Sequence, residues 1–139
     1  MQELALHILD LVENSLRANA SIIKLTIKED KKNDLLIIII KDNGLGMDKN
    51  KLKNIMDPFY TTKPDKRIGL GLSLFAQAAR ESGGTMKLES EPGKGMKIEA
   101  TFKLNHPDRK PIGNIDETMY VLKETHPEVK FIFNINGIY

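Results

Sequence analysis

The sequence predicts an α/β (α+β) two-layer sandwich, in which helices cover one face of a mixed, mostly antiparallel sheet. Two observations predict this fold. First, an amphipathic helical segment opens the chain, and two strand-like segments follow, joined only by the polar loop "EDKKND". A loop this short joins antiparallel strands. Second, this order of one helix followed by two strands is repeated, because a further helical segment precedes two more strand-like segments. A doubly wound parallel sheet would instead alternate single strands with helices.

The N-terminal half of the chain provides the first elements. Residues 3–18 predict a helix with a broad apolar face, formed by Leu4, Ala5, Ile8, Leu9, Leu11, Val12 and Leu16. Residues 22–28 and 35–41 predict two strands, and the four isoleucines of the second suit a strand that is covered on both faces. We expect a short helix over 49–55. We expect a loop over 57–67, where "DPFYTTKPDKR" has two prolines and no consistent period.

Two further strands are predicted after a helix that begins with a glycine. This helix begins at Gly69 and ends before Gly83 and Gly84, because glycine is the usual residue just beyond a helix C-terminus. Residues 86–90 and 97–104 alternate as strands on either side of the turn "EPGKG". These segments complete a domain over residues 1–104.

A change in composition at "NHPDRKPIGN" marks a C-terminal extension over residues 105–139. It predicts a helix over 115–125 and a strand over 129–135, packed on the same domain at an edge of the sheet. Such an addition stabilises an open sheet edge, which is otherwise prone to association. The alternative is a surface for a partner protein or for a homodimer.

Composition excludes several classes of protein. The 139 residues are 40% hydrophobic and 29% charged, which is typical of a soluble globular protein. The absence of cysteine excludes disulfides, thiolate metal sites and a thiol nucleophile. No apolar run is long enough to span a membrane, and the N-terminus lacks the basic lead of a signal peptide, so we expect a cytoplasmic protein. The net charge of +2 is weak and the lysines are dispersed, so nucleic-acid binding is not expected.

Polar side chains of the first helix form one candidate site. Glu3, His7, Asp10, Asn14 and Arg17 fall on one stripe of the helix, at spacings of four and three residues. The stripe is either the solvated face of an amphipathic helix or a polar face turned toward a ligand. In the second case the Asn14 carbonyl oxygen could bind a hard cation such as Mg²⁺, and Asp10 could hold a water molecule.

Glycine-rich segments form the other candidates. In "DNGLGM", Asp42 is either a turn residue or an acceptor for the amino group of a purine at the end of a buried strand. In "RIGLGLS", Gly69 and Gly71 form either a tight loop–helix junction or a helix start whose N–H groups face phosphate oxygens. The segment lacks a dinucleotide fingerprint and the lysine–serine ending of a P-loop. Thr62 and Lys63 lie in the loop between the two segments.

The order of these segments resembles the ATP-binding domain that gyrase, heat-shock chaperones, histidine kinases and the mismatch-repair protein MutL share. The resemblance covers about residues 3–104, and it rests on an acid four residues before an asparagine, then "DNGLGM", "DPFYTTK", "GLGLS" and "ESEPGKG". The later segments are most similar to histidine kinases, and "DLVENSLRANA" is more similar to MutL and mitochondrial protein kinases. The resemblance implies the Bergerat α/β sandwich, with ATP as the ligand and Mg²⁺ as its cofactor.

The resemblance also implies roles for single residues. Asn14 would ligate the Mg²⁺ that bridges the ATP phosphates, and Asp42 would bind the exocyclic amine of adenine. Gly44 and Gly46 would clear room for the nucleotide, and Met47 would pack against the purine. The residues that would complete the nucleotide site and its lid are Arg17, Thr62, Lys63, Arg67, Gly69, Leu70, Gly71 and Leu72.

Asp10 decides which reaction the resemblance implies. ATPases of this superfamily, and the serine kinases among its anti-sigma factors, carry a glutamate there as general base, whereas histidine kinases usually carry no carboxylate. Asp10 keeps the carboxylate on a shorter side chain, so we expect it to be the catalytic residue of an ATPase or of a kinase toward Ser or Thr. Met96 departs from the family pattern, in which a threonine near adenine is common.

We therefore expect a Mg²⁺-dependent ATP-binding regulatory protein, either a stand-alone Ser/Thr protein kinase or a slow ATPase switch, which acts on a protein partner. One alternative is the catalytic module of a histidine kinase. Its phosphorylated histidine would then lie on a separate partner, because we expect no helical hairpin before Met1. A second alternative is a non-catalytic ATP sensor, and a MutL-like role in DNA repair would require a further domain.

Overall fold

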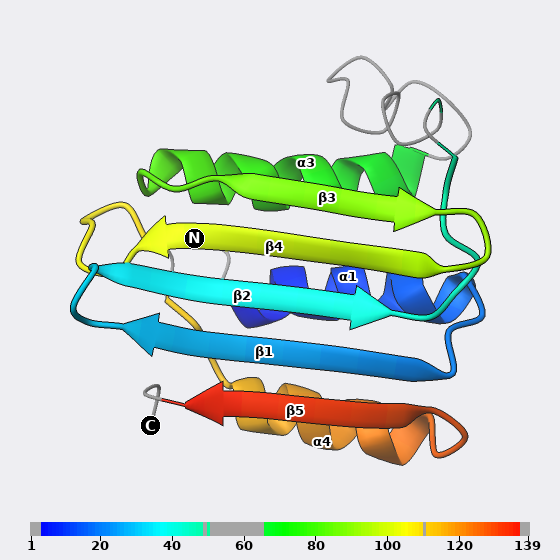
Figure 1. The fold of residues 1–139 in the computed structure, drawn as a ribbon. Helices are drawn as coiled ribbons and strands as arrows, with labels where there is room; N and C mark the ends of the chain where they lie inside the picture. The colour runs from blue at the N-terminus through cyan, green and yellow to red at the C-terminus, as the bar shows by residue number, and fades with distance from the viewer. Residues whose placement is uncertain (1–3, 49, 51–65, 110, 137–139) are drawn as a thin grey trace.

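The computed structural model describes residues 4–48, 50, 66–109 and 111–136 of the chain (Figure 1). The elements in chain order are α1 (Leu4–Arg17), β1 (Ile22–Asp30), β2 (Leu35–Asp42), α3 (Lys66–Glu81), β3 (Met86–Glu91), β4 (Gly95–Lys103), α4 (Ile115–Thr125) and β5 (Lys130–Asn136). Among the described helices, none has the length and apolar character that crossing a membrane requires.

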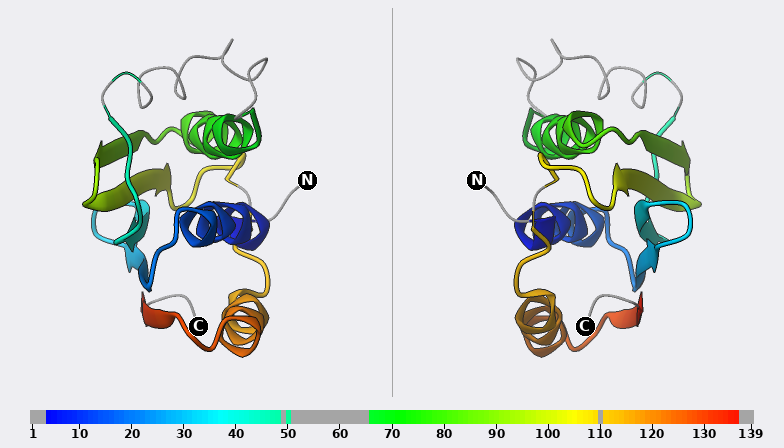
Figure 2. Two further views of the ribbon diagram at one scale, coloured as in Figure 1. Left: turned by 90° about the vertical axis from the view of Figure 1, so that its right-hand side faces the viewer. Right: turned by 90° about the vertical axis from the view of Figure 1, so that its left-hand side faces the viewer.

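The strands form a five-stranded sheet in the order β3-β4-β2-β1-β5. The pairs β3–β4, β4–β2 and β2–β1 are antiparallel, and β1–β5 is parallel. The helices α1, α3 and α4 lie on one side of the sheet (Figure 2), and in the described part of the chain no element covers the opposite face. The structure therefore confirms the predicted two-layer α/β sandwich.

The central strand β2 shows how the sequence builds the core. Leu36, Ile38 and Ile40 are buried on the side of the helices, and Ile37 and Ile39 are half-buried on the open face. The prediction that this strand is covered on both faces is therefore wrong. An unbroken apolar run does not reveal that one face of a central strand is shielded only by the side chains of its neighbours, here those of β1 and β4.

The helix α3 begins earlier than predicted. It starts at Lys66 rather than at Gly69, so Lys66 and Arg67 are helical and do not belong to a loop. Leu72 and Phe75 are buried and hold this helix on the core. A helix held in this way tolerates an internal glycine, which costs about 1 kcal/mol relative to alanine. Gly69 therefore lies within the first turn instead of starting the helix.

The other boundaries agree within a few residues. The predicted hairpin of β1 and β2 is antiparallel, as expected. The helix expected over 115–125 is α4, and the strand expected over 129–135 is β5, one residue later. The helix expected over 49–55, apart from residue 50, and residues 57–65 of the loop expected over 57–67 lie outside the described residues.

The C-terminal segment is tied to the start of α1. The N–H groups of Leu4 and Ala5 donate to the carbonyl oxygens of Pro111 and Ile112, each over 2.8 Å. The first N–H groups of a helix have no partner within it, so these bonds satisfy two of them. At the other end of the segment, β5 lies parallel to β1 and forms the edge of the sheet. The segment thus contacts both layers of the sandwich.

Candidate functional site

A cavity of about 160 Å³ lies between α1, α3 and the end of the sheet at which β2 finishes. Its volume is below the roughly 300–1,000 Å³ of pockets that enclose a whole ligand, so it suits a flat ring better than a larger molecule. Its walls are mostly apolar. The residues that line it are Leu11, Asn14, Ser15, Arg17, Ala18, Asp42, Leu45, Gly46, Met47, Leu72, Met96 and Ile98.

Asp42 places a buried carboxylate in this cavity. It is the last residue of β2 and follows Ile38 and Ile40 on the inward-facing side of the strand, which leaves it 8% exposed. The Ser15 hydroxyl donates to Asp42 Oδ2 over 2.5 Å, and the Gly44 N–H donates to Oδ1 over 2.8 Å. These two bonds fix the carboxylate. Each oxygen retains a lone pair that can accept a hydrogen bond from a ligand.

The glycines that follow β2 are required by neighbouring backbone. A Cβ on Gly44 would lie 2.7 Å from the carbonyl oxygen of Ala18, and one on Gly46 would lie 2.0 Å from that of Glu91. Gly46 also has a φ of +72°, which favours glycine. Neighbouring protein backbone thus excludes a side chain at both positions, and the room that they would leave for a nucleotide stays a prediction. Gly46 nevertheless lines the cavity.

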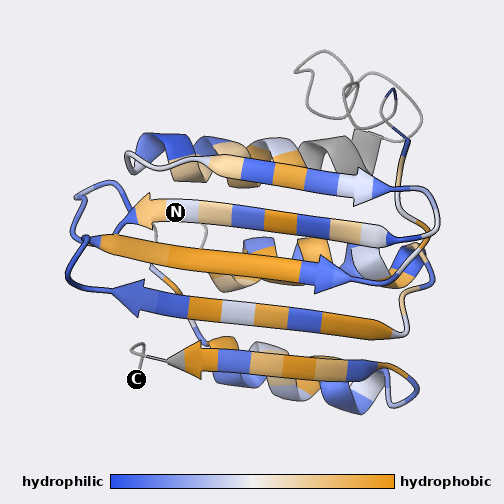
Figure 3. Ribbon diagram, in the orientation of Figure 1, coloured by the Kyte–Doolittle hydropathy of each residue, from blue (hydrophilic) through white to orange (hydrophobic). Residues whose placement is uncertain are grey.

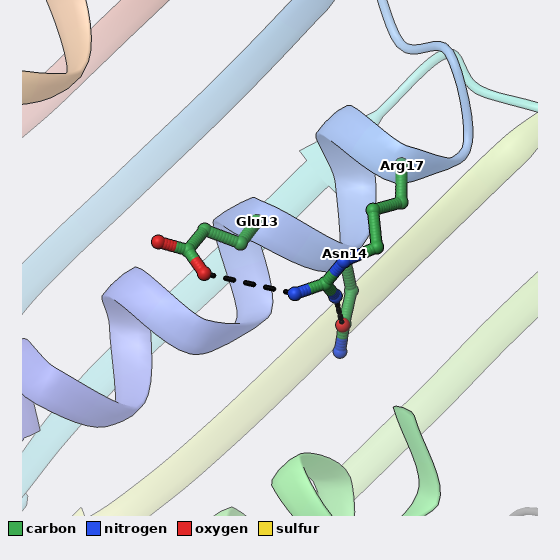
Figure 4. A network of polar contacts seen from close by, with 3 residues as sticks. All are labelled: Glu13, Asn14 and Arg17. Atoms are coloured by element: carbon green, nitrogen blue, oxygen red, sulfur yellow. Dashed lines mark hydrogen bonds and ion pairs between the residues drawn. The ribbon is translucent and has the colours of Figure 1, made fainter. Parts of the chain in front are cut away.

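The mouth of the cavity is polar, and its groups come from the last turn of α1 (Figure 4). Arg17 Nη1 donates to Asn14 Oδ1 over 2.5 Å, and Arg17 Nη2 lies 3.7 Å from Glu13 Oε2. On the α3 side, a Cβ on Gly71 would lie 3.8 Å from Asn14 Nδ2. The amide oxygen of Asn14 is of a kind that binds a hard cation such as Mg²⁺. In the described ranges, no group of three or more His, Cys, Asp or Glu side chains could hold a metal ion.

The structure brings many of the predicted site residues together. Those that line the cavity are Asn14, Arg17, Asp42, Gly46, Met47 and Leu72. Gly44 lies behind the Asp42 carboxylate, and Gly71 lies beside Asn14. The backbone of Arg67, Gly69 and Leu70 belongs to the first turns of α3. Thr62 and Lys63 lie outside the described residues.

Asp10 does not line the cavity. It lies on α1, four residues before Asn14, and its side chain is exposed. One helical turn is about 5.4 Å along the axis, so Asp10 lies about one turn before Asn14 and the cavity mouth. Its position is suited to a group that approaches from solvent, and not to direct contact with a ring inside the cavity.

The sequence did not identify Ser15 or most of the apolar wall. The wall residues that were missed are Leu11, Ala18, Leu45 and Ile98. The sequence pattern could have identified Ser15, because it lies four residues after Leu11 and continues the buried stripe of Leu4, Ile8 and Leu11. A hydroxyl in an apolar stripe requires a buried partner, and that partner is Asp42.

The chain is similar to known proteins over most of its length. The family model described as "Histidine kinase-, DNA gyrase B-, and HSP90-like ATPase" matches residues 2–106. Sporulation kinase C of Bacillus subtilis is 36% identical over 96 residues, which cover 69% of this chain and 22% of that protein. Sensor kinase CckA of Brucella abortus is 35% identical over 82 residues, which cover 58% of this chain and 8% of that protein. The chain thus spans less than a quarter of the length of these curated relatives.

A solved structure has the same fold. The ATPase domain of Aquifex aeolicus MutL, complexed with ADP, matches with a TM-score of 0.62 and 20% sequence identity, covering 99% of this chain and 61% of that one. At this identity the similarity concerns the fold alone. The family model, in contrast, extends over all the residues that line the cavity. The chain therefore belongs to the family of histidine kinase-, DNA gyrase B- and HSP90-like ATPases.

Proposed function

We propose that this ATP-binding domain holds Mg²⁺-ATP in the cavity beside Asp42 and transfers the γ-phosphoryl group to a protein side chain or to water. It would act in the cytoplasm as a Ser/Thr protein kinase or a slow ATPase switch. The observation that carries the proposal is the Asp42 carboxylate, which is buried in an apolar cavity and held from two sides by Ser15 and Gly44.

The cavity favours adenine over guanine. The Asp42 carboxylate is a hydrogen-bond acceptor, so it suits the exocyclic amine of adenine and disfavours the carbonyl oxygen that guanine carries at that position. Met47, Met96 and Ile98 provide apolar surface for the faces of the ring. Because the carboxylate is already fixed by two donors, it would lose little conformational freedom when the base binds.

Asn14 would hold the magnesium ion. Mg²⁺ usually takes few protein ligands and completes its shell with water and phosphate oxygens, and one amide oxygen at the cavity mouth fits that pattern. When bound, the ion neutralises charge on the phosphates. Arg17, which donates to Asn14 Oδ1, would turn to the phosphates, where its fork of donors suits their oxygens.

Asp10 would act as the general base. Its carboxylate would accept the proton of the attacking hydroxyl group or water, whose oxygen forms the new bond to the γ-phosphorus. The bond between that phosphorus and the oxygen of the β-phosphate then breaks, and ADP leaves. Its exposed position on the same helix as Asn14 suits a base that receives its substrate from solvent.

A second candidate is the catalytic module of a histidine kinase that acts with a separate histidine-bearing partner. Two observations favour it. The curated relatives include sporulation and sensor kinases, of which the chain matches only a small part. In addition, Asp10 lies outside the cavity lining, as a position without a catalytic role would. An ATP sensor without turnover is the third candidate.

The variant Asp42→Asn tests nucleotide recognition. We expect it to weaken the binding of Mg²⁺-ATP by about tenfold or more, because a hydrogen bond to a charged group is lost, and to leave the weak binding of Mg²⁺-GTP unchanged. Isothermal titration calorimetry measures both. Asp116→Asn, in the exposed first turn of α4, is the matched control. Equal affinity of the wild type and Asp42→Asn for ATP would refute the proposed recognition.

The variant Asp10→Ala tests the chemistry. We expect the purified wild type to release phosphate from Mg²⁺-ATP. The variant should bind the nucleotide normally but lose turnover, because the attacking water would lose the carboxylate that accepts its proton. Turnover that persists in the variant would exclude Asp10 as the base. If neither protein turns over bound ATP, both are incubated with candidate partner proteins and labelled ATP. Transfer of the label to a partner would favour one of the two kinase functions, and no transfer would favour an ATP sensor.

A further inference from the structure

The open face of the sheet carries a row of lysines. Lys24 on β1 is paired with Lys41 on β2, and Lys41 is paired with Lys97 on β4. Directly paired residues of neighbouring antiparallel strands point to the same face, with Cβ atoms roughly 4.5–5.5 Å apart. Three lysine side chains thus leave the sheet side by side from three neighbouring strands. This lysine row (Lys24, Lys41 and Lys97) alternates with the buried Ile23, Ile40 and Ile98, so it lies on the open face of the sheet, which is turned toward the reader in Figure 3.

Two of the three lysines in the row, Lys24 and Lys41, are not neutralised by the described part of the protein. Like charges that face each other across strands destabilise a sheet. Lys97 is the compensated end of the row, because its Nζ lies 4.0 Å from Glu99 Oε1 and its cross-strand partner on β3 is Glu89. Among the described residues, no ion pair involves Lys24 or Lys41, and both side chains are exposed. These uncompensated lysines give the face a positive potential, which attracts negatively charged groups from outside the domain.

Apolar side chains flank the lysine row. Ile132 on β5 is paired with Lys24, and Ile39 is the next residue on this face of β2 after Lys41. Ile22, at the start of β1, is also exposed. The face therefore combines cations with branched aliphatic surface. Such a combination suits a protein segment, in which acidic and apolar side chains can alternate along one strand.

The same face lacks features that nucleic-acid binding favours. Single-stranded nucleic acids stack their bases on aromatic side chains. Phe131 and Phe133 are in register with the buried Ile23 and Leu25, so they point toward the helices. In the strands that the structure describes, this face carries no aromatic residue and no arginine.

We propose that the lysine row and its flanking isoleucines dock an acidic segment of a partner protein, in which acidic and apolar side chains alternate. Charge complementarity identifies this occupant, and the isoleucines provide its apolar contacts. The surface lies on the side of the sheet opposite to α1 and α3, which border the nucleotide cavity (Figure 2). A partner can therefore dock here without covering that cavity, and the proposal does not depend on the reaction proposed above.

A designed peptide tests this surface. The probe is a short fluorescein-labelled peptide of alternating glutamate and valine, titrated with the full chain in low salt and followed by fluorescence anisotropy. The double variant Lys24→Glu/Lys41→Glu reverses the charge of the row. The matched control is Lys31→Glu/Lys32→Glu, which places the same change of charge in the exposed β1–β2 loop. We expect the first variant to weaken peptide binding by about tenfold or more and the control to bind as the wild type does.

Three results would overturn the proposal. Absence of peptide binding would do so, and equal weakening in both double variants would show that only net charge matters. Tighter binding of a single-stranded oligonucleotide or of phosphatidylserine vesicles, abolished by Lys24→Glu/Lys41→Glu, would replace the protein partner by a nucleic acid or a membrane. Binding of Mg²⁺-ATP by both double variants serves as the test of folding, so a negative result here leaves the proposed function untouched.

Discussion

Ser15 joins α1 to the floor of the cavity through a single hydroxyl group. It is 4% exposed, and its hydrogen bond to Asp42 Oδ2 is one of two that hold the carboxylate. We expect Ser15→Ala to lower the free energy of unfolding by about 1–3 kcal/mol, because a buried acceptor loses its donor. The same change should weaken the binding of Mg²⁺-ATP, since Asp42 would no longer be fixed. Urea unfolding and titration calorimetry measure the two effects.

Ser21→Ala is the matched control for this residue. The Ser21 hydroxyl also makes one hydrogen bond, accepting from Asn43 Nδ2 over 2.9 Å, but the bond is exposed to solvent. Water can replace that partner, so we expect a change within roughly 0.5 kcal/mol. Equal losses in the two variants would show that burial of the Ser15–Asp42 bond does not matter.

At the scale of elements, the pairing of β1, β2 and β4 places Lys41 between two other lysines. Lys41→Glu would turn two like-charge cross-strand pairs into attractive ones. Each such pair contributes roughly 0.2–1 kcal/mol, so we expect the variant to be more stable than the wild type. Urea unfolding in low salt tests this, and the gain should shrink in high salt because the pairs are exposed.

Lys32→Glu provides the control for that gain, because Lys32 lies in the β1–β2 loop and faces no lysine across a ladder. A gain of similar size there would attribute the effect to lower net charge instead of to strand pairing. A loss of stability in Lys41→Glu would contradict the side-by-side placement of the lysine row.

Periodicity and turn chemistry predicted the elements because they act over a few neighbouring residues. The motif that ends β2 also located Asp42 at the cavity. Other features depend on contacts between distant segments. Met96 and Ile98 reach the cavity only because β4 pairs with β2, and the early start of α3 depends on how Leu72 and Phe75 pack. Likewise, the sequence of β2 alone does not predict that helices cover only one of its faces.

At the scale of the whole molecule, the C-terminal extension and the main domain share one hydrophobic core. Leu122 of α4 is 2% exposed and belongs to the same buried cluster as Leu4 of α1. We expect Leu122→Ala to lower the free energy of unfolding by about 2–5 kcal/mol through the cavity that it leaves. If the extension is part of one cooperative unit, the loss appears as a shift of a single transition.

Thermal and urea unfolding, followed by circular dichroism, measure this shift, and Val121→Ala is the control. Val121 is the preceding residue of α4 and is 45% exposed, so its truncation should change stability by roughly 0.5 kcal/mol or less. An early, separate transition in Leu122→Ala, with the main transition unchanged, would show that the extension unfolds alone. In that case it could leave the β1 edge while the rest of the sheet stays folded. That edge would then be free to pair with another chain, and the extension would be a partner surface and not a fixed part of the fold.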